Sequence, residues 1–107
     1  FKSINDVEGL KKVGEECLQK GKIEFAFEVF SALDDKARLK ELGDKSVEDR
    51  QYTTAAKAYH LASDIPSLNS LGEICIKEGF IPIALDIYEL AGNKIMVEFI
   101  KENFLQK

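Results

Sequence analysis

The stretch LKKVGEECLQKG, residues 10–21, has the apolar spacing of an amphipathic helix, yet it carries a glycine, Gly14, in its middle. Leu10, Val13 and Cys17 follow one another at three- and four-residue steps, which predicts a helix with one apolar stripe. A glycine in a helix interior costs roughly 1 kcal/mol relative to alanine, because it loses more backbone freedom on folding. We therefore expect the packing around position 14 to require a residue without a side chain.

This glycine returns at a constant spacing. Gly14, Gly43 and Gly72 are 29 residues apart, and each follows an apolar residue and precedes an acidic one. Other columns keep the same register without a gap: Leu10, Leu39, Leu68; Cys17, Ser46, Cys75; Ile23, Tyr52, Ile81; Ala26, Ala55, Ala84; Phe30, Tyr59, Tyr88; Leu33, Ala62, Ala91; and Asp35, Asp64, Asn93. Such a register predicts a repeat architecture.

Each repeat contains two helical stripes separated by stop and start signals. Gly21 and Gly79 are placed as left-handed C-terminal caps of the first helix, and Pro82 fits the first turn of the next helix. The residues expected to cap the following helix are Asp35, Asp64 and Asn93. The middle repeat has Arg50 in place of the capping glycine, so we expect that turn to be looser or closed differently.

The chain is therefore predicted to be all-α and to form one domain of antiparallel helix pairs. The expected units are residues 7–35, 36–64 and 65–93, preceded by the end of an earlier repeat (1–6) and followed by a terminal helix (94–107). Because the first residue is Phe1 rather than methionine, we expect a fragment of a longer protein. Within each pair we expect the glycine to face an alanine at close approach, and these pairs are Gly14 with Ala26, Gly43 with Ala55, and Gly72 with Ala84.

The glycine, alanine and aromatic columns resemble the tetratricopeptide repeat, whose pattern has leucine-glycine, then alanine and an aromatic residue at these offsets. The period of 29 is shorter than the 34 residues of that family, and its terminal proline is missing. Shortened repeats of this kind are similar to the helical regions of coatomer and intraflagellar-transport proteins. The resemblance implies a right-handed α-solenoid with about three full repeats and partial repeats at both ends.

Few side chains offer chemistry for catalysis or for a cofactor. His60, the one histidine, falls in a column with Ser31 and Glu89 that we expect to be exposed, and Cys17 and Cys75 fall in a column that we expect to be buried, as free thiols. The glycines are isolated in helices rather than clustered in a phosphate-binding loop. We expect no enzyme activity, no cofactor and no metal.

Composition excludes further classes of function. With 107 residues, 45% hydrophobic and 32% charged, the chain is long enough for one modest domain. With a net charge of -4, we expect the chain to lack the basic surface that binding to nucleic acids requires. No stretch has the length and apolarity of a membrane span, so we expect a cytoplasmic protein.

Two further columns are candidates for a partner-binding surface: Glu15, Asp44 and Glu73, and three residues further on Leu18, Val47 and Ile76. The resemblance implies that these offsets line the concave groove of the solenoid, where an acidic and an apolar ladder would bind a basic and apolar protein or peptide. The alternative is that the carboxylates are solvated and the aliphatic side chains pack between repeats. In that case the surface around Phe25 and Ile83 on the convex side is the candidate.

The function expected from these observations is a non-catalytic scaffold for protein–protein interaction in a larger assembly, such as a vesicle-coat or transport complex. One alternative is an adaptor that binds acidic peptide C-termini, although Glu15, Asp44 and Glu73 stand where that class needs asparagine. Another is a regulatory domain attached to a catalytic one.

Overall fold

The computed structural model describes residues 7–105, and the expectation for residues 1–6 lies outside this range. This part of the chain is all-α, with no strand. The helices are α1 (Val7–Gln19), α2 (Ile23–Leu33), α3 (Lys36–Glu48), α4 (Tyr52–Leu61), α5 (Ile65–Glu78), α6 (Ile81–Ala91) and α7 (Lys94–Ile100), after which the chain continues as a π-helical turn, η2 (Lys101–Leu105).

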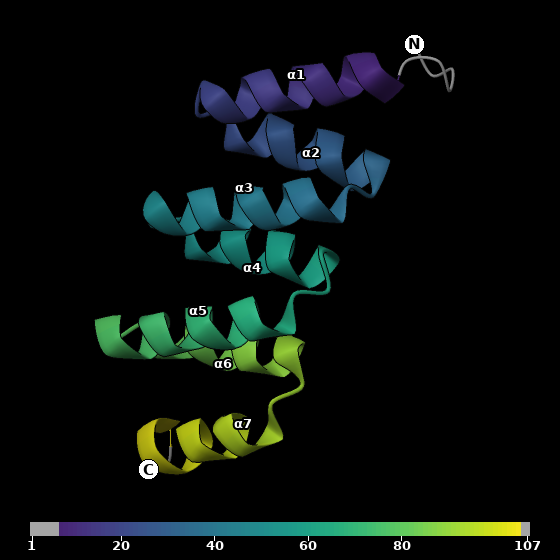
Figure 1. Ribbon diagram of the computed structural model, residues 1–107. Helices are drawn as coiled ribbons and strands as arrows, with labels where there is room; N and C mark the ends of the chain where they lie inside the picture. The colour runs from purple at the N-terminus through teal and green to yellow at the C-terminus, as the bar shows by residue number, and fades with distance from the viewer. Residues whose placement is uncertain (1–6, 106–107) are drawn as a thin grey trace.

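The helix boundaries follow the spacing of the sequence. The helices α1, α3, α5 and α7 begin at residues 7, 36, 65 and 94, and α2, α4 and α6 begin at residues 23, 52 and 81. The closest neighbours are α1 with α2, α3 with α4 and α5 with α6, and each pair also contacts the next one. Figure 1 shows them stacked in chain order, with α1 at one end and α7 at the other. The stack measures 55 × 23 × 19 Å.

The first helices of the later pairs begin at the expected caps. The side chains of Asp35, Asp64 and Asn93 accept hydrogen bonds from the backbone N–H groups of Arg38, Ser67 and Met96 at 3.2, 3.2 and 3.1 Å. Each side chain satisfies one of the N–H groups that a helix start leaves without a partner. Pro82 lies in the first turn of α6, as expected.

The turn between the two helices of a pair is left-handed in all three pairs. Gly21 and Gly79 have φ of 80° and 87°, as expected, but Arg50 adopts the same conformation with φ of 60°. The expectation of a looser turn at Arg50 is wrong: Gln51 N–H donates to Ser46 O at 2.7 Å, as Phe80 N–H does to Cys75 O at 2.8 Å. Arg50 is thus one of three non-glycine residues with positive φ in the described chain, together with Asp34 and Ser63.

The helix-interior glycines are required by aromatic rings and not, as expected, by alanines. A Cβ atom placed on Gly14 would lie 2.8 Å from the Phe30 ring. The equivalent distances are 2.5 Å from Gly43 to Tyr59 and 2.6 Å from Gly72 to Tyr88, and no alanine atom is among the three nearest at any of these glycines. The alanines Ala26, Ala55 and Ala84 are fully buried. The closest neighbour of each glycine is therefore an aromatic ring, where the spacing predicted an alanine.

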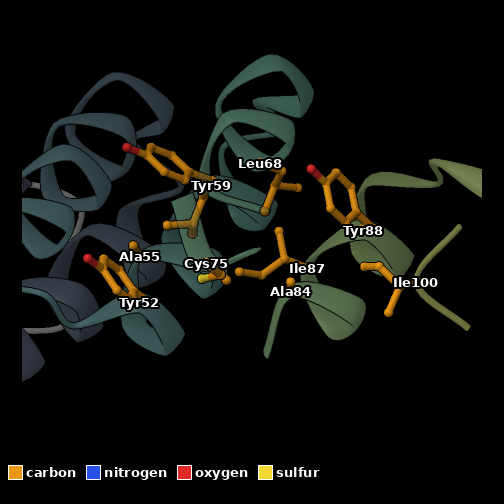
Figure 2. Packing of buried hydrophobic residues seen from close by; sticks show 11 residues of the cluster. Tyr52, Ala55, Tyr59, Leu68, Cys75, Ala84, Ile87, Tyr88 and Ile100 are labelled. Carbon is orange, nitrogen blue, oxygen red and sulfur yellow. The ribbon is translucent and has the colours of Figure 1, made fainter. Parts of the chain in front are cut away.

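The core consists of two clusters along the stack. Figure 2 shows the larger one, where Cys75 lies between Tyr52 and Ala55 on one side and Ala84 and Ile87 on the other. The smaller cluster joins the first and second pairs through Leu18, Ala26, Phe30, Leu39, Leu42 and Ala58. Val13 is 49% exposed although its equivalents Leu42, Leu71 and Ile100 are buried, because no described helix packs against the outer side of α1.

Candidate functional site

The acidic face consists of Glu15, Asp44 and Glu73, one from each of α1, α3 and α5. Glu15 is half-buried and forms an ion pair with Arg38 of the next pair. Arg38 also donates to Glu41 at 2.8 Å, and these two carboxylates, Glu41 first, raise its pKa. Glu73 is exposed and has no ion pair within the described chain. The face is therefore only partly available to a basic partner.

Asp44 is the most constrained member of the acidic face. It accepts a hydrogen bond of 2.5 Å from the Tyr59 hydroxyl and lies 3.5 Å from the ammonium of Lys40. Burial, together with the charge of Asp44, raises the pKa of Tyr59 far above its ordinary value. Asp44 also lines two shallow clefts, one of about 300 Å³ beside α1 and one of about 180 Å³ beside α5. Its carboxylate thus orients Tyr59, whose ring covers Gly43.

The apolar column beside the acidic face serves packing. Leu18 is 9% exposed and belongs to the smaller core cluster. Val47 and Ile76 are half-buried and pack against the larger cluster. These aliphatic side chains therefore do not form an open strip, and the structure agrees with the packing alternative for this column.

The remaining candidates are single side chains. Both cysteines are free, as expected, but only Cys75 is fully buried, and Cys17 is half-buried. Burial raises the pKa of the Cys75 thiol to about 11. His60 is exposed on α4. Between residues 7 and 105 no three His, Cys, Asp or Glu side chains are grouped so that they could hold a metal ion.

A further group of exposed apolar side chains lies at the C-terminal end of the stack, and the repeat pattern did not predict it as a site. This terminal apolar face consists of Ile95, Phe99, Phe104 and Leu105, which are 82%, 44%, 47% and 44% exposed. The rings of Phe99 and Phe104 meet edge to face with centroids 6.1 Å apart. The sequence does carry a signal: at the position of Phe99 the earlier helices have Lys12, Glu41 and Ser70, and at that of Ile95 they have Glu8, Ala37 and Pro66.

The convex-side candidates differ from one another. Phe25 is 61% exposed, whereas Ile83 is half-buried and packs against the core. Phe25 is thus the available member of that pair.

Comparison of the chain with protein families, with curated proteins and with solved structures gives no match. The exposed surfaces of the chain are therefore the basis of the function proposed below. None of the helices in residues 7–105 is long and apolar enough to cross a lipid bilayer.

Proposed function

We propose that this chain is a right-handed α-solenoid segment that acts as a non-catalytic protein–protein interaction scaffold in a larger cytoplasmic assembly, of the vesicle-coat or transport kind. The terminal apolar face is the observation that carries the proposal. Ile95 and Phe99 are exposed about one helical turn apart on α7, and the Phe99 ring meets the exposed ring of Phe104. The residues equivalent to Phe99 in the earlier helices are polar. Contiguous exposed apolar surface of this kind is typical of interaction sites.

The elongated stack supports a scaffold rather than an enclosed site. Its length of 55 Å is more than twice either other dimension, so much of the chain lies near the surface. The clefts on the acidic face are shallow, and Asp44 and Glu15 are engaged by side chains of the chain itself. A peptide-binding groove along that face is accordingly the weaker alternative, with Glu73 as its one exposed carboxylate without an ion pair in the described part.

The partner expected for the terminal apolar face is a protein that presents apolar side chains at its centre. A basic rim on that partner would complement the net charge of -4 of this chain. Apolar anchors buried at the centre of an interface contribute most of the binding energy, whereas charges at the rim govern the association rate.

The test is capture of partners from a cell extract by the immobilised chain, followed by binding measurements with the purified partner. The double variant Ile95→Glu, Phe99→Glu introduces residues that Glu8 and Glu41 already place at equivalent exposed positions, so folding should be unaffected. Its Kd for the partner should rise by about tenfold or more. Ser70→Glu, at the position equivalent to Phe99, is the matched control and should bind as the wild type does.

Two results would overturn the proposal. One is that no protein is retained specifically by the wild-type chain. The other is that a purified partner binds the double variant and the wild type with equal affinity, which would leave the terminal apolar face without a role in binding.

A further inference from the structure

The turn ends of adjacent helix pairs meet at two equivalent junctions, and one of them is filled by the chain's own side chains. Between the second and third pairs, Arg50 Nη2 donates to Glu78 Oε1 at 2.7 Å. The Tyr52 hydroxyl also donates to Glu78 at 3.1 Å, and its ring lies against Phe80 with centroids 5.9 Å apart. A guanidinium, a carboxylate and two rings thus close this junction.

The equivalent junction between the first and second pairs is an open cleft of about 440 Å³, which we call the turn pocket. Its lining includes Gly21, Ile23, Gln51 and Asp49, which stand where the filled junction has Arg50, Tyr52, Phe80 and Glu78. A Cβ atom on Gly21 would have no neighbour within 4 Å. This junction therefore has a carboxylate but neither the guanidinium nor the two rings of the filled junction.

The rest of the lining determines what the turn pocket can accept. Phe25 is 61% exposed, and Glu24 adds a second carboxylate. Lys22 is the one basic side chain of the lining, and among the described residues neither Asp49 nor Glu24 forms an ion pair. An exposed aromatic face beside carboxylates favours a planar cation.

We propose that the turn pocket binds an arginine side chain of a partner protein. The guanidinium would donate to Asp49 as Arg50 donates to Glu78, and it would stack on Phe25. Lysine would fit less well, because its ammonium neither stacks on a ring as a plane nor forms paired hydrogen bonds with a carboxylate. The partner of the proposed scaffold function would thus carry an arginine at this site. The existence of such a partner rests on the proposed function, whereas the binding properties of the pocket do not.

The test uses N-acetyl-arginine amide as the probe and follows the backbone amides of the 107-residue chain by NMR. Saturable shifts should be confined to residues 21–25 and 49–54, and N-acetyl-lysine amide should bind more weakly. Asp49→Asn should weaken arginine binding about two- to fivefold, as expected for one exposed ion pair. Phe25→Ala should have an effect of similar size, about two- to fivefold, through the lost cation–π contact. Asp86→Asn, an exposed carboxylate on α6, is the matched control and should leave binding unchanged.

A second variant fills the turn pocket from within. Gly21→Arg combined with Ile23→Tyr and Gln51→Phe copies the filled junction, and the left-handed Arg50 shows that arginine is accepted in this turn. This variant should fold with undiminished thermal stability and lose arginine binding. Arginine binding that survives in it, arginine shifts that are not saturable, or equal binding of arginine and lysine would overturn the inference.

The failure of this inference can be told apart from the failure of the proposed function. If a purified partner binds through the terminal apolar face while the probe does not bind, the inference alone is wrong. If the probe binds as expected and no partner is captured, the pocket is supported and the scaffold proposal is wrong.

Discussion

Asn93 Nδ2 donates a hydrogen bond of 2.9 Å to Asn69 Oδ1, and this amide pair stands where the two earlier helix pairs have ion pairs. The equivalent contacts are Lys11 Nζ to Asp35 Oδ2 at 3.8 Å and Lys40 Nζ to Asp64 Oδ2 at 3.6 Å. Both partners differ from those of the earlier pairs, so the same contact is made with different chemistry. The second residue of each contact, Asp35, Asp64 or Asn93, also caps the start of a helix. The contact thereby joins the first helix of one pair to the start of the first helix of the following unit.

The first prediction concerns replacement of the Asn69–Asn93 amide pair by an ion pair. The double variant Asn69→Lys, Asn93→Asp should recreate the ion pair of Lys40 and Asp64 and keep the helix cap, so its free energy of unfolding should lie within about 1 kcal/mol of wild type. Its stability should fall with added salt more than that of the wild type, because exposed ion pairs are screened. Urea unfolding at two ionic strengths measures both quantities.

Asn93→Ala is the comparison for this prediction. It removes the cap and the amide contact together and should cost about 1 kcal/mol or more. If the double variant proves as unstable as Asn93→Ala, the three contacts are not equivalent.

The helix boundaries were predictable because their signals are local. A capping side chain such as Asp64, or a glycine that adopts a left-handed turn such as Gly79, acts within a few residues of its own position. Arg50 shows where local rules fail: it adopts the left-handed conformation that its own preference disfavours, and its side chain contacts Glu78, 28 residues away.

The packing partner of the glycines was not predictable from spacing. The columns of Ala55 and Tyr59 keep the same register relative to Gly43, so the period cannot distinguish them. What decides is the reach of the side chain, because a tyrosine ring extends several ångströms further than a methyl group and covers the glycine from a more distant position. The distance that a side chain reaches across a helix pair depends on the three-dimensional structure and cannot be read from the repeat spacing.

The candidate surfaces were predictable in part. Phe99 is apolar at a position where the earlier helices are polar, and a column comparison could have found it. The turn pocket could not be found in this way, because it exists only where Gly21, Ile23 and Gln51 are small or short at the same junction. No single column shows that coincidence.

The second prediction concerns the glycine column. Gly43→Ala should destabilise the chain by about 1 to 3 kcal/mol, because the new methyl group would lie 2.5 Å from the buried Tyr59 ring, which has little room to move. This cost should outweigh the gain of up to about 1 kcal/mol in helix propensity. Thermal or urea unfolding gives the difference.

Gly9→Ala is the matched control within α1. A Cβ atom at Gly9 would have no neighbour within 4 Å, so this variant should be stabilised by up to about 1 kcal/mol. Opposite signs for the two alanine variants are the expected result. Equal stabilisation by both would show that Tyr59 does not require the glycine.

The third prediction concerns Ser46, which stands in the column of Cys17 and Cys75. It is fully buried, and its hydroxyl has no hydrogen-bond partner among the described residues. A buried unsatisfied polar group costs about 1 to 3 kcal/mol, so Ser46→Ala should raise the free energy of unfolding even though it removes an atom. Urea unfolding should show a higher midpoint with an unchanged slope. A lower midpoint would mean that the hydroxyl does have a partner.

The last prediction is a pH dependence that arises from Cys75. Burial, reinforced by the charge of Glu78, raises the pKa of its thiol from 9.0 to about 11. Between these values the unfolded chain loses the thiol proton while the folded chain keeps it, so the unfolded state binds fewer protons and stability falls as the pH rises. The loss from this one group should approach about 1.4 kcal/mol for each pH unit above 9. The measurement is urea unfolding at pH 8, 9 and 9.8, under reducing conditions.

Cys75→Ala isolates most of this contribution, because the other titrating side chains are present in both chains. Tyr52, Tyr59 and Tyr88 also have raised pKa values, and their titration in the unfolded chain lowers stability in the same direction around pH 10. The range therefore ends at pH 9.8, and the comparison with the variant removes most of their contribution. The difference in unfolding free energy between wild type and variant should begin to shrink between pH 8 and 9 and shrink more steeply above pH 9, as the wild type loses stability. A difference that stays constant to pH 9.8 would mean that the Cys75 thiol titrates in the folded chain as it does in the unfolded one, and that the core around it is open to water.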